Sequence, residues 1–350
     1  MSRVSLVHRK LVVLLAFALG LLVLLAGCGS GSSQGGQGES DAVRIGYQVI
    51  PNAAVLAKQR GAIEEAMGDV PVEWSQFDSG SAVITAMTSG SIDVALAGTT
   101  AAATAIASDL PIQVIGIHDV IAESESLVAK ESSGISGLAD LRGKRVAVPF
   151  GSTTHFALLQ ALSDEGIPQE DVRILDMQPQ EMVAAWDSEN IDAGYVWEPS
   201  LSQMVSNGGK IVLTSKDLLD RGIVTADLIV ATEEFVENHS DLATNYVRAI
   251  DDSVEFYRSD PDESATLVAE EIGLEPDVAA NQMNGLVWLN AEEQLSPEYM
   301  GTPDNVGALA QTLKDTGDFM MGQGAIPSSP ELSAYREKVN PEFWQQIAQQ

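Results

Sequence analysis

Hydroxyl side chains gather at three points where an apolar strand pattern gives way to a helix pattern. The unpaired amides of a first helical turn, together with the helix dipole, favour an anion, and Ser or Thr adds donors without charge. Glycine in the same segments lets a ligand approach the backbone closely. An anion site is therefore predicted from these side chains: Ser79 and Ser81, Thr99 and Thr100, and the run Ser152, Thr153, Thr154 and His155.

Each junction also has a purely structural explanation. Ser81, Thr99 and Ser152 can act as helix N-caps, each worth about 1 kcal/mol of stability. For one junction alone the cap is the simpler explanation, whereas three junctions in successive strand–helix units favour a site. The chain contains neither GxGxxG nor GxxxxGK[ST], so no nucleotide fingerprint accompanies them.

A segment of opposite character, Tyr-Val-Trp-Glu-Pro, occupies residues 195–199. The face of Trp197 and the carboxylate of Glu198 suit an ammonium group, which gains about 0.5–2 kcal/mol from a Trp face. Asp227, near the start of a later apolar run, can supply negative charge from the other side of a cleft. The alternatives are that Trp197 packs in a core and that Glu198 is solvated. Gln48, the last residue of the first strand pattern, completes the candidate ligand-binding set.

From residue 41 onward, short apolar runs alternate with helical patterns. This alternation predicts an α/β fold in which helices cover both faces of parallel sheets. Ligands in such folds bind beyond the carboxyl ends of the strands, where the polar segments lie. Strands are predicted at 43–48, 72–77, 93–97, 112–118, 145–149, 172–177, 193–197 and 210–214. Helices are predicted at 53–66, 82–89, 101–108, 154–165 and 180–187, and helical runs such as 241–258 and 276–288 dominate residues 235–350.

Two further apolar runs, 126–130 and 227–231, bracket one complete block of strands and helices. They predict paired hinge strands between two lobes, with the ligand cleft between the lobes. The first lobe would comprise residues 42–131 and 226–350. The second lobe would comprise residues 132–225.

The amino-terminal segment has the pattern of a secretory signal. Three basic residues precede an apolar run from Leu11 to Ala26 that is shorter than the about 20 residues of a spanning helix. Leu-Ala-Gly-Cys at 25–28 resembles a bacterial lipobox. Residues 1–27 are therefore predicted to be a lipoprotein signal peptide, Cys28 the lipidated first mature residue, and 28–41 a flexible tether. The alternative is a permanent membrane anchor with a free thiol.

Composition narrows the classes of partner. The 350 residues include 50 acidic and 19 basic side chains, a formal net charge of −31. Because Lys and Arg supply most of the affinity for a phosphate backbone, no nucleic-acid partner is expected. The single cysteine excludes an internal disulfide and a cysteine-based zinc finger. The histidines that follow the signal are scattered, so no metal site is predicted.

Three segments together resemble the substrate-binding proteins of taurine ABC importers: FDSGS at 77–81, VPFGSTTH at 148–155 and IDAGYVWEP at 191–199. The resemblance covers residues 43 to about 232 well and the later helices mainly in pattern. It implies a two-lobed, type II periplasmic-binding-protein-like fold with two hinge strands that closes on a sulfonate without a cofactor. It also implies an ABC permease and its ATPase as partners. A lipid-anchored monomer on the outer face of the cytoplasmic membrane is expected.

The resemblance implies a receptor for taurine, a zwitterion with a sulfonate and an ammonium group. Neutral donors at the helix starts would hold the sulfonate, and Trp197 with Asp227 or Glu198 would hold the ammonium. Glu198 stands where a small residue is expected, so an added cleft carboxylate could alter amine preference. Wider relatives bind other alkanesulfonates, nitrate or pyrimidine precursors, and these ligands stay open as alternatives.

Two other classes of function are weighed against a receptor. A hydrolase could use Ser152 as nucleophile and His155 as base, but side chains this close at a helix start seldom form a hydrogen-bonded dyad, so no enzyme is predicted. A surface adhesin or scaffold would fit the tether. It would not explain the anion-ready helix starts.

The lipobox interpretation predicts the effect of Cys28→Ser. The variant should accumulate as unprocessed precursor and take up no lipid label, because the only thiol of the chain is lost. Folding should survive. Metabolic labelling with a fatty acid and the electrophoretic mobility of the protein are the measurements, and normal maturation of the variant would contradict the interpretation.

Overall fold

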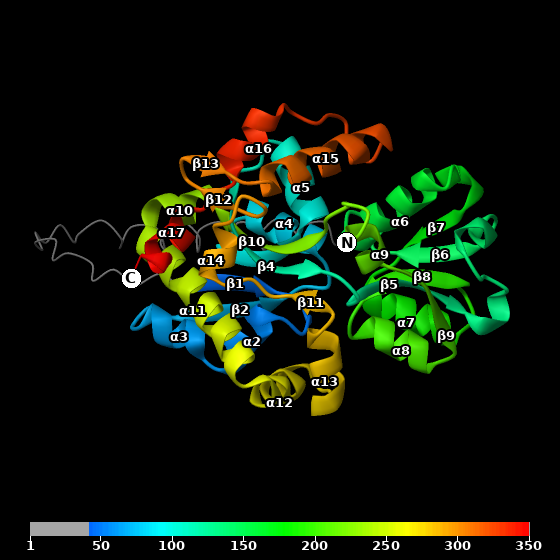
Figure 1. Ribbon diagram of the computed structural model, residues 1–350, viewed down its shortest axis with the longest axis horizontal. Helices are drawn as coiled ribbons and strands as arrows, with labels where there is room; N and C mark the ends of the chain where they lie inside the picture. The colour runs from blue at the N-terminus through cyan, green and yellow to red at the C-terminus, as the bar shows by residue number, and fades with distance from the viewer. Residues whose placement is uncertain (1–41, 350) are drawn as a thin grey trace, which may run out of the picture. The chain divides into compact units, whose positions relative to one another are not determined.

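Two mixed β-sheets form the framework of the computed structural model, which describes residues 42–349 (Figure 1). The six strands of the first sheet lie in the order β11-β4-β10-β3-β1-β2, and the five strands of the second in the order β7-β6-β8-β5-β9. Each sheet with its helices is here called a lobe. The predicted signal peptide, Cys28 and the tether at 28–41 lie outside the described residues.

The strands of the first sheet are β1 (Val43–Tyr47), β2 (Val72–Gln76), β3 (Val94–Gly98), β4 (Ile112–Ile121), β10 (Ala226–Thr232) and β11 (Leu286–Val287). Those of the second sheet are β5 (Glu125–Lys130), β6 (Arg145–Val148), β7 (Arg173–Asp176), β8 (Ala193–Trp197) and β9 (Gly209–Thr214). A hairpin is formed by β12 (Gly301–Thr302) and β13 (Asn305–Val306).

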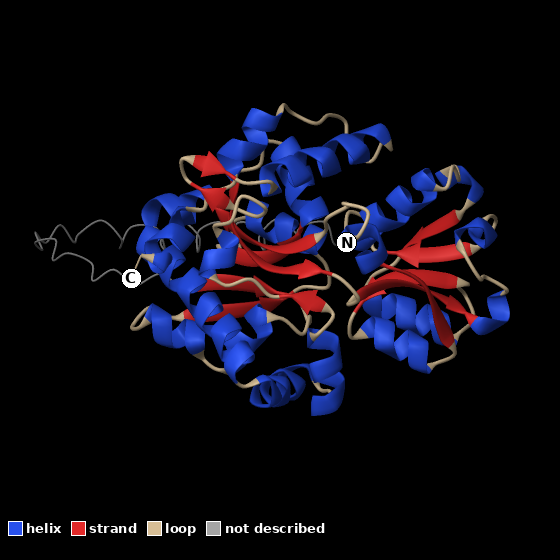
Figure 2. Ribbon diagram, in the orientation of Figure 1, coloured by secondary structure: helices blue, strands red, loops and turns tan. Residues whose placement is uncertain are grey.

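Helices cover both faces of each sheet (Figure 2). Those of the second lobe are α6 (Thr153–Asp164), α7 (Pro179–Asp187), α8 (Ser200–Ser206) and α9 (Ser215–Leu219). Those of the first lobe are α2 (Ala53–Gln59), α3 (Ala62–Met67), α4 (Gly80–Thr88), α5 (Thr99–Ala107), α10 (Glu233–Asn238), α11 (Ser240–Ser259), α12 (Pro261–Ile272), α13 (Pro276–Met283), α14 (Ala291–Gln294), α15 (Leu309–Gly322), α16 (Leu332–Lys338) and α17 (Glu342–Ala348). Short 3₁₀ turns lie at Glu131–Ser133, Leu138–Leu141 and Gln169–Asp171.

The central strands are apolar throughout because both of their faces are buried. In β3, Val94 and Leu96 belong to the core on one face of the first sheet, whereas Ala95 and Ala97 belong to the core on the other. In β6, Val146 and Ala147 divide in the same way between two cores of the second sheet. This is the alternation expected of a strand buried on both faces, and it confirms the predicted α/β architecture.

The chain passes between the sheets twice, once between β4 and β5 and once between α9 and β10. The two segments proposed as hinge strands do not pair with each other. The strand β5 pairs with β8 and β9 in the second sheet, and β10 pairs with β3 and β4 in the first. The first crossing therefore lies at residues 122–124, ahead of the expected lobe boundary at 131.

Other expectations also differ in detail from the structure. Both sheets are mixed rather than parallel, because β10 and β5 run antiparallel to their neighbours after the chain crosses. The helix expected over 53–66 is divided in two by Gly61, whose φ of 66° is left-handed. The helix expected over 276–288 ends at Met283.

Two bulges in β4 shape the edge of the first sheet where β10 begins. The pairing of β4 with β10 shifts register twice, leaving His118 and Ile115 as the extra residues. The amide of Gln294 accepts from the Ile117 N–H at 3.1 Å and donates to the Ile117 carbonyl at 2.5 Å. Trp344 donates its indole N–H to the Ile115 carbonyl at 2.7 Å. Side chains of α14 and α17 thus satisfy backbone groups that the bulges leave unpaired.

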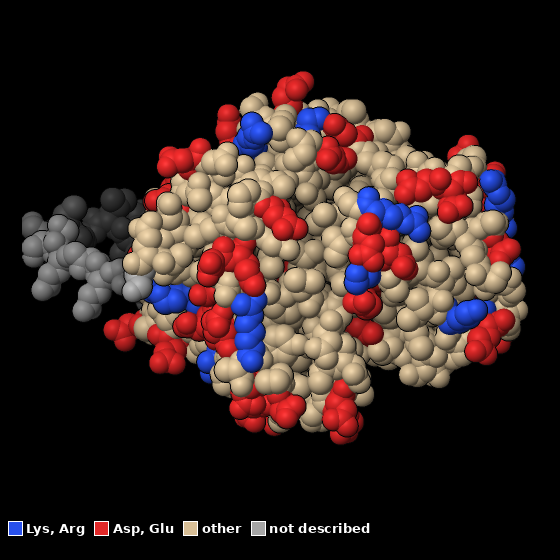
Figure 3. All heavy atoms as spheres, in the orientation of Figure 1, with Lys and Arg blue, Asp and Glu red and all other residues tan. Residues whose placement is uncertain are grey.

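The surface carries the negative charge that the composition predicts. On the face in Figure 3, acidic side chains are spread over both lobes, with basic side chains scattered among them. None of the helices within residues 42–349 is long and apolar enough to span a membrane.

The role of Gln294 predicts that Gln294→Ala destabilises the protein. Its loss leaves two buried backbone groups without partners, at about 1–3 kcal/mol for each unsatisfied group. Urea unfolding followed by circular dichroism measures the loss. Gln311→Ala, at an exposed position of α15, is the matched control and should stay within about 0.5 kcal/mol of the parent protein. Equal midpoints for the two variants would contradict the role assigned to Gln294.

Candidate functional site

A small cavity of about 20 Å³ lies between the lobes, where strands and helix starts from both sheets meet. It receives the carboxyl ends of β1, β3 and β8 and the first residues of β5 and β10, which run the other way. Its lining residues are Gln48, Ile50, Gly80, Gly98, Ala101, Glu125, Ser152, Thr153, Trp197 and Asp227.

Three helices, α4, α5 and α6, begin at this cavity, with Gly80, Ala101 and Thr153 in their first turns. At α4 and α5 the N-cap residues, Ser79 and Gly98, make no side-chain cap hydrogen bond. The N–H groups of a first turn have no partner within their own helix. Three helix dipoles therefore place partial positive charge around one point, the environment that an anion prefers.

The start of α6 is capped by its own hydroxyls. Ser152 accepts from the His155 N–H at 3.1 Å, donates to the Pro149 carbonyl at 2.6 Å and lies 2.8 Å from the Thr154 hydroxyl. The cap interpretation thus holds for Ser152, although the residue also lines the cavity. Thr154 is fully buried behind it and does not line the cavity.

Two carboxyl groups face the cavity from opposite lobes. Glu125 accepts hydrogen bonds from the hydroxyls of Thr153, at 2.5 Å, and Ser215, at 3.4 Å. Burial raises the pKa of Glu125 to about 8 and that of Asp227 to about 7. Among the described residues neither carboxyl makes an ion pair with a Lys or Arg. The cavity therefore offers two buried acidic groups that lack a cation.

Trp197, from the segment 195–199 that the sequence singled out, and Gln48 also line the cavity. Trp197 is 8% exposed, belongs to a core cluster of the first lobe and also lines the cavity, so the core and site interpretations both apply. Gln48 is 4% exposed and donates its amide to the Leu96 carbonyl at 3.3 Å. Its position at the end of β1 is thereby fixed.

The two lobes contact each other at the wall of the cavity, through Gly98 of the first lobe and Thr153 of the second. A β-carbon built on Gly98 would lie 2.7 Å from the Thr153 methyl group, closer than carbon atoms can approach. Ser81 donates its hydroxyl to the Phe150 carbonyl at 3.1 Å, and so joins the lobes without lining the cavity. Glycine at position 98 is thus required for this close approach.

Several other predicted residues point away from the cavity. His155 stacks on Phe150 with ring centroids 4.6 Å apart, and both line a separate hollow against Met320 and Ile326. Its Nδ1 accepts from the Gly151 N–H at 3.2 Å, and burial lowers its pKa to about 4. The imidazole is therefore neutral at pH 7, and its Nδ1 is already hydrogen-bonded within its own loop.

Glu198 also turns away and serves α8. Its carboxylate accepts from the N–H of Ser202 at 3.0 Å and from the Ser202 hydroxyl at 2.8 Å, and Gln282 donates to the same hydroxyl at 3.2 Å. Burial raises its pKa, while the bonds from Ser202 oppose that shift. The carboxylate therefore stabilises the first turn of α8 rather than facing the cavity.

Thr99 and Thr100 are completely buried in the first turn of α5, and neither hydroxyl has a partner among the described residues. Neither residue lines the cavity, although Gly98 and Ala101 on either side of them in the sequence do. Ser79 is 2% exposed at the start of α4 and also does not line the cavity.

The cavity includes residues that the sequence patterns did not single out. Glu125 is the most consequential, since it is a buried acid at the first position of β5. Its signal was a charged residue directly before the apolar run at 126–130. The others are Ile50, Gly80, Gly98 and Ala101, whose backbones or small side chains shape the walls.

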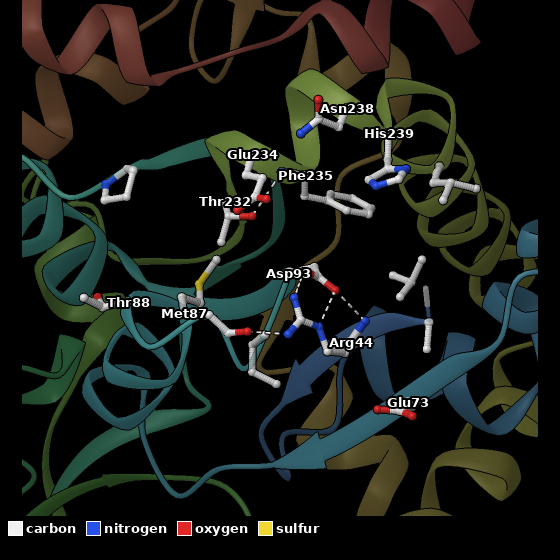
Figure 4. Close-up of a pocket in the computed structure, with 16 residues that line it drawn as sticks. Arg44, Glu73, Met87, Thr88, Asp93, Thr232, Glu234, Phe235, Asn238 and His239 are labelled. Atoms are coloured by element: carbon white, nitrogen blue, oxygen red, sulfur yellow. Dashed lines mark hydrogen bonds and ion pairs between the residues drawn. The ribbon is translucent and has the colours of Figure 1, made fainter. Parts of the chain in front are cut away.

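A larger hollow of about 650 Å³ lies beside the first residues of β1 and the end of β10 (Figure 4). Arg44 there is held by Asp93 through both its backbone and its guanidinium, and it also donates to the Gly90 carbonyl. This charge is balanced, and the hollow adjoins the amino ends of β1 and β3, opposite the edge where α/β folds bind ligands. Within residues 42–349 no cluster of His, Cys, Asp and Glu is arranged to hold a metal ion.

Comparison with known families and curated proteins gives consistent matches. A family model described as NMT1/THI5 like matches residues 55–264. The chain is 30% identical over 298 residues to the taurine-binding periplasmic protein of Escherichia coli, covering 83% of this chain and 90% of that protein. It is 28% identical over 323 residues to a putative aliphatic sulfonates-binding protein of Bacillus subtilis, with 91% of each chain covered.

Solved structures share the fold. The alkanesulfonate-binding protein SsuA from Xanthomonas axonopodis pv. citri, bound to MOPS, has a TM-score of 0.71 at 22% identity, covering 84% of this chain and 97% of that one. The aliphatic sulphonate-binding protein SsuA from Escherichia coli has a TM-score of 0.70 at 24% identity, covering 87% and 99%. The expected two-sheet periplasmic-binding-protein fold is thereby confirmed.

Proposed function

Because the chain belongs to the NMT1/THI5-like family, we propose that it is a receptor that binds taurine outside the cytoplasm and delivers it to an ABC importer. Relatives named as sulfonate-binding periplasmic proteins support the solute-binding role. The choice of taurine rests on one observation about this chain: Glu125 and Asp227 line the cavity as buried acids without a cation.

The two acids select a ligand that carries a positive group. A buried charge is costly unless it is paired, so a ligand ammonium beside Asp227 and Glu125 supplies the missing partner. Trp197 adds an aromatic face on which an ammonium can lie. An alkanesulfonate without an amine leaves these groups uncompensated, and nitrate does the same.

The helix starts supply the opposite end of the site. The sulfonate would lie at the first turns of α4, α5 and α6, where the backbone N–H groups of three helix starts converge. Within residues 42–349 no Lys or Arg lines the cavity. The sulfonate of a bound zwitterion would thus lie at the helix dipoles, where neutral groups donate to it. Its ammonium would lie at the acids.

Binding must be accompanied by movement of the lobes. A cavity of about 20 Å³ has room for about one water molecule, so an amino sulfonate enters only when the lobes separate. The two chain crossings, at residues 122–124 and 220–225, are the connections about which they would rotate.

An ABC permease and its ATPase complete the proposed transport system, and a lipid on Cys28 would hold the receptor at the outer face of the cytoplasmic membrane. The receptor is proposed to act as a monomer. The hydrolase alternative has little support. Ser152 donates to Pro149 and His155 Nδ1 accepts from Gly151, so the two side chains serve their own loop.

The charge argument predicts the ligand preference and its origin. In a thermal-shift panel of taurine, ethanesulfonate, nitrate, phosphate, β-alanine and a pyrimidine phosphate, taurine should stabilise most, by about 2.7 kcal/mol at a concentration 100-fold above Kd. Asp227→Asn should weaken taurine tenfold to about a hundredfold in calorimetry, since a hydrogen bond to a charged group is worth about 1.5–3 kcal/mol. The affinity of the variant for ethanesulfonate should not fall.

Glu198→Gln is the matched control for Asp227→Asn. It neutralises a buried carboxyl of the same cleft edge that does not line the cavity, so the ratio of taurine to ethanesulfonate affinity should stay unchanged. A stronger response of the parent protein to ethanesulfonate than to taurine would remove the amine from the proposal. The ligand would then be a general alkanesulfonate.

Closure of the lobes is tested by Gly98→Ala. The added methyl meets the Thr153 methyl at 2.7 Å, so the lobes cannot close fully and taurine affinity should fall at least about tenfold. Adding Thr153→Ser removes the opposing methyl but keeps the hydroxyl, and should restore most of the affinity. If calorimetry shows that Gly98→Ala binds taurine like the parent protein, the lobes do not close in this way on the ligand.

A further inference from the structure

Asp119 is a third acidic side chain at this edge of the first sheet, although it does not line the cavity. It lies directly opposite Asp227 in the pairing of β4 with β10, next to the bulge at His118. Asp119 is 0% and Asp227 6% exposed. The Asn52 amide donates to Asp119 Oδ2 at 3.1 Å, whereas Oδ1 has no partner among the described residues.

Nothing packed around this pair supplies a positive charge. The groups that face Asp119 are Asp227 of β10, Glu125 of β5 and the Asn52 amide before α2. Its neighbour His118 lies with its ring edge-on to Tyr246 of α11, and burial lowers the His118 pKa to about 3, so this imidazole is neutral. Burial raises the pKa of Tyr246, which is also neutral.

One ion pair lies at the other end of β4. Lys338 of α16 pairs with Glu233 of α10 and also donates to the Leu110 carbonyl, just before the strand begins. The Asp119–Asp227 pair is therefore surrounded by neutral or acidic groups only, within the part of the chain that the structure describes.

Two ionised carboxylates cannot comfortably face each other in this setting. Like charges directly opposite on neighbouring strands are destabilising, and two buried carboxyls in contact share a proton. Burial and the neighbouring Asp227 raise the pKa of Asp119, while a hydrogen bond from Asp119 limits the rise for Asp227. A proton between them also gives Asp119 Oδ1 the partner that it lacks.

Glu125 is placed differently. Each of its carboxylate oxygens already accepts a hydroxyl hydrogen bond, from Thr153 and from Ser215. Both oxygens therefore have partners, and any proton that Glu125 carries because burial raises its pKa to about 8 has to be counted apart from that of the pair. The orphaned oxygen of Asp119 distinguishes the pair as the place where a proton is structurally required.

We propose that the Asp119–Asp227 pair holds one proton in the ligand-free receptor and releases it to solvent when the ligand ammonium binds beside Asp227. The proposal rests on the proposed function, since taurine supplies the ammonium. One positive charge enters and one proton leaves to water, so the charge of the site is conserved. Asp119 does not touch the ligand. It is a positioning residue that sets the protonation of Asp227.

Proton release makes affinity depend on pH with a defined sign. Where binding expels one proton, affinity rises with pH by up to about tenfold per unit, until the ligand-free pair has already lost its proton. Delivery of the ligand then reverses the exchange, and the emptied site takes up a proton. A more acidic exterior would weaken capture by the same factor.

The test is calorimetry of taurine binding to the mature chain at pH 6.5, in buffers that differ in ionisation enthalpy. The parent protein should release about one proton per taurine. Asp119→Asn should release about one proton fewer than the parent protein, and its affinity should depend less on pH, because an amide cannot hold the shared proton and donates to Asp227 instead. Glu125→Gln is the matched control. It should bind more weakly, and it removes any proton that Glu125 releases while keeping the proton of the pair.

A second measurement needs no ligand. A carboxyl whose folded pKa is raised above its unfolded value stabilises the fold at low pH and loses that contribution as pH rises through the folded value. The ligand-free parent should therefore lose stability between about pH 5 and pH 8, and Asp119→Asn should lose less. This profile depends on the shared proton and not on taurine.

The outcomes separate the two proposals. Zero proton release by the parent, or release abolished by Glu125→Gln but unchanged in Asp119→Asn, overturns the role of the pair. Absence of any taurine binding overturns the proposed function, and the ligand-free pH profile then decides on the shared proton alone. Identical profiles for the parent and Asp119→Asn overturn the proton whether or not taurine binds.

Discussion

A group of acidic side chains buried between two lobes is the constraint on which the rest of this structure depends. Glu125, Asp227 and Asp119 lie in or behind one cavity, and no Lys or Arg among the described residues pairs with them. Ionising carboxyl groups buried in this way costs several kcal/mol per ion unless each finds a positively charged partner. The site therefore lacks a cation, which a ligand can supply. The helix starts of α4, α5 and α6 face the same cavity with partial positive charge, which gives the site two poles rather than one net sign.

The two poles could be predicted from sequence only in part. Strand ends are visible as apolar runs that stop, and residues directly after them meet at one edge of a sheet, which is why Gln48, Ser152, Thr153 and Trp197 were singled out and do line the cavity. The direction in which a side chain leaves a junction is set by local geometry. Residues two apart on a helix point to nearly opposite sides, so Thr153 facing the cavity turns His155 away from it.

Glu125 shows why the rest of the site could not be predicted from the sequence. Strand patterns identify residues 126–130, but β5 begins one residue earlier, and a charged residue at the start of an apolar run ordinarily faces solvent. Its burial results from the antiparallel course of β5, which brings a strand beginning, rather than a strand end, to the cavity. Glu198 is the converse case. Its sequence position suited a ligand, yet the unpaired N–H of Ser202 on α8 is the nearer partner.

The bulges of β4 carry a consequence for where the necessary sequence ends. Gln294 and Trp344 hold the stretch of β4 that leads into Asp119, and both belong to the carboxyl-terminal helices, beyond residue 264 where the family match stops. The region that the family model matches thus contains most of the cavity lining but neither Gln294 nor Trp344. A chain shortened to that region would keep most cavity-lining residues, without Gln48 and Ile50, and would lose the two side chains that support β4, so relatives with divergent tails need their own substitutes for Gln294 and Trp344.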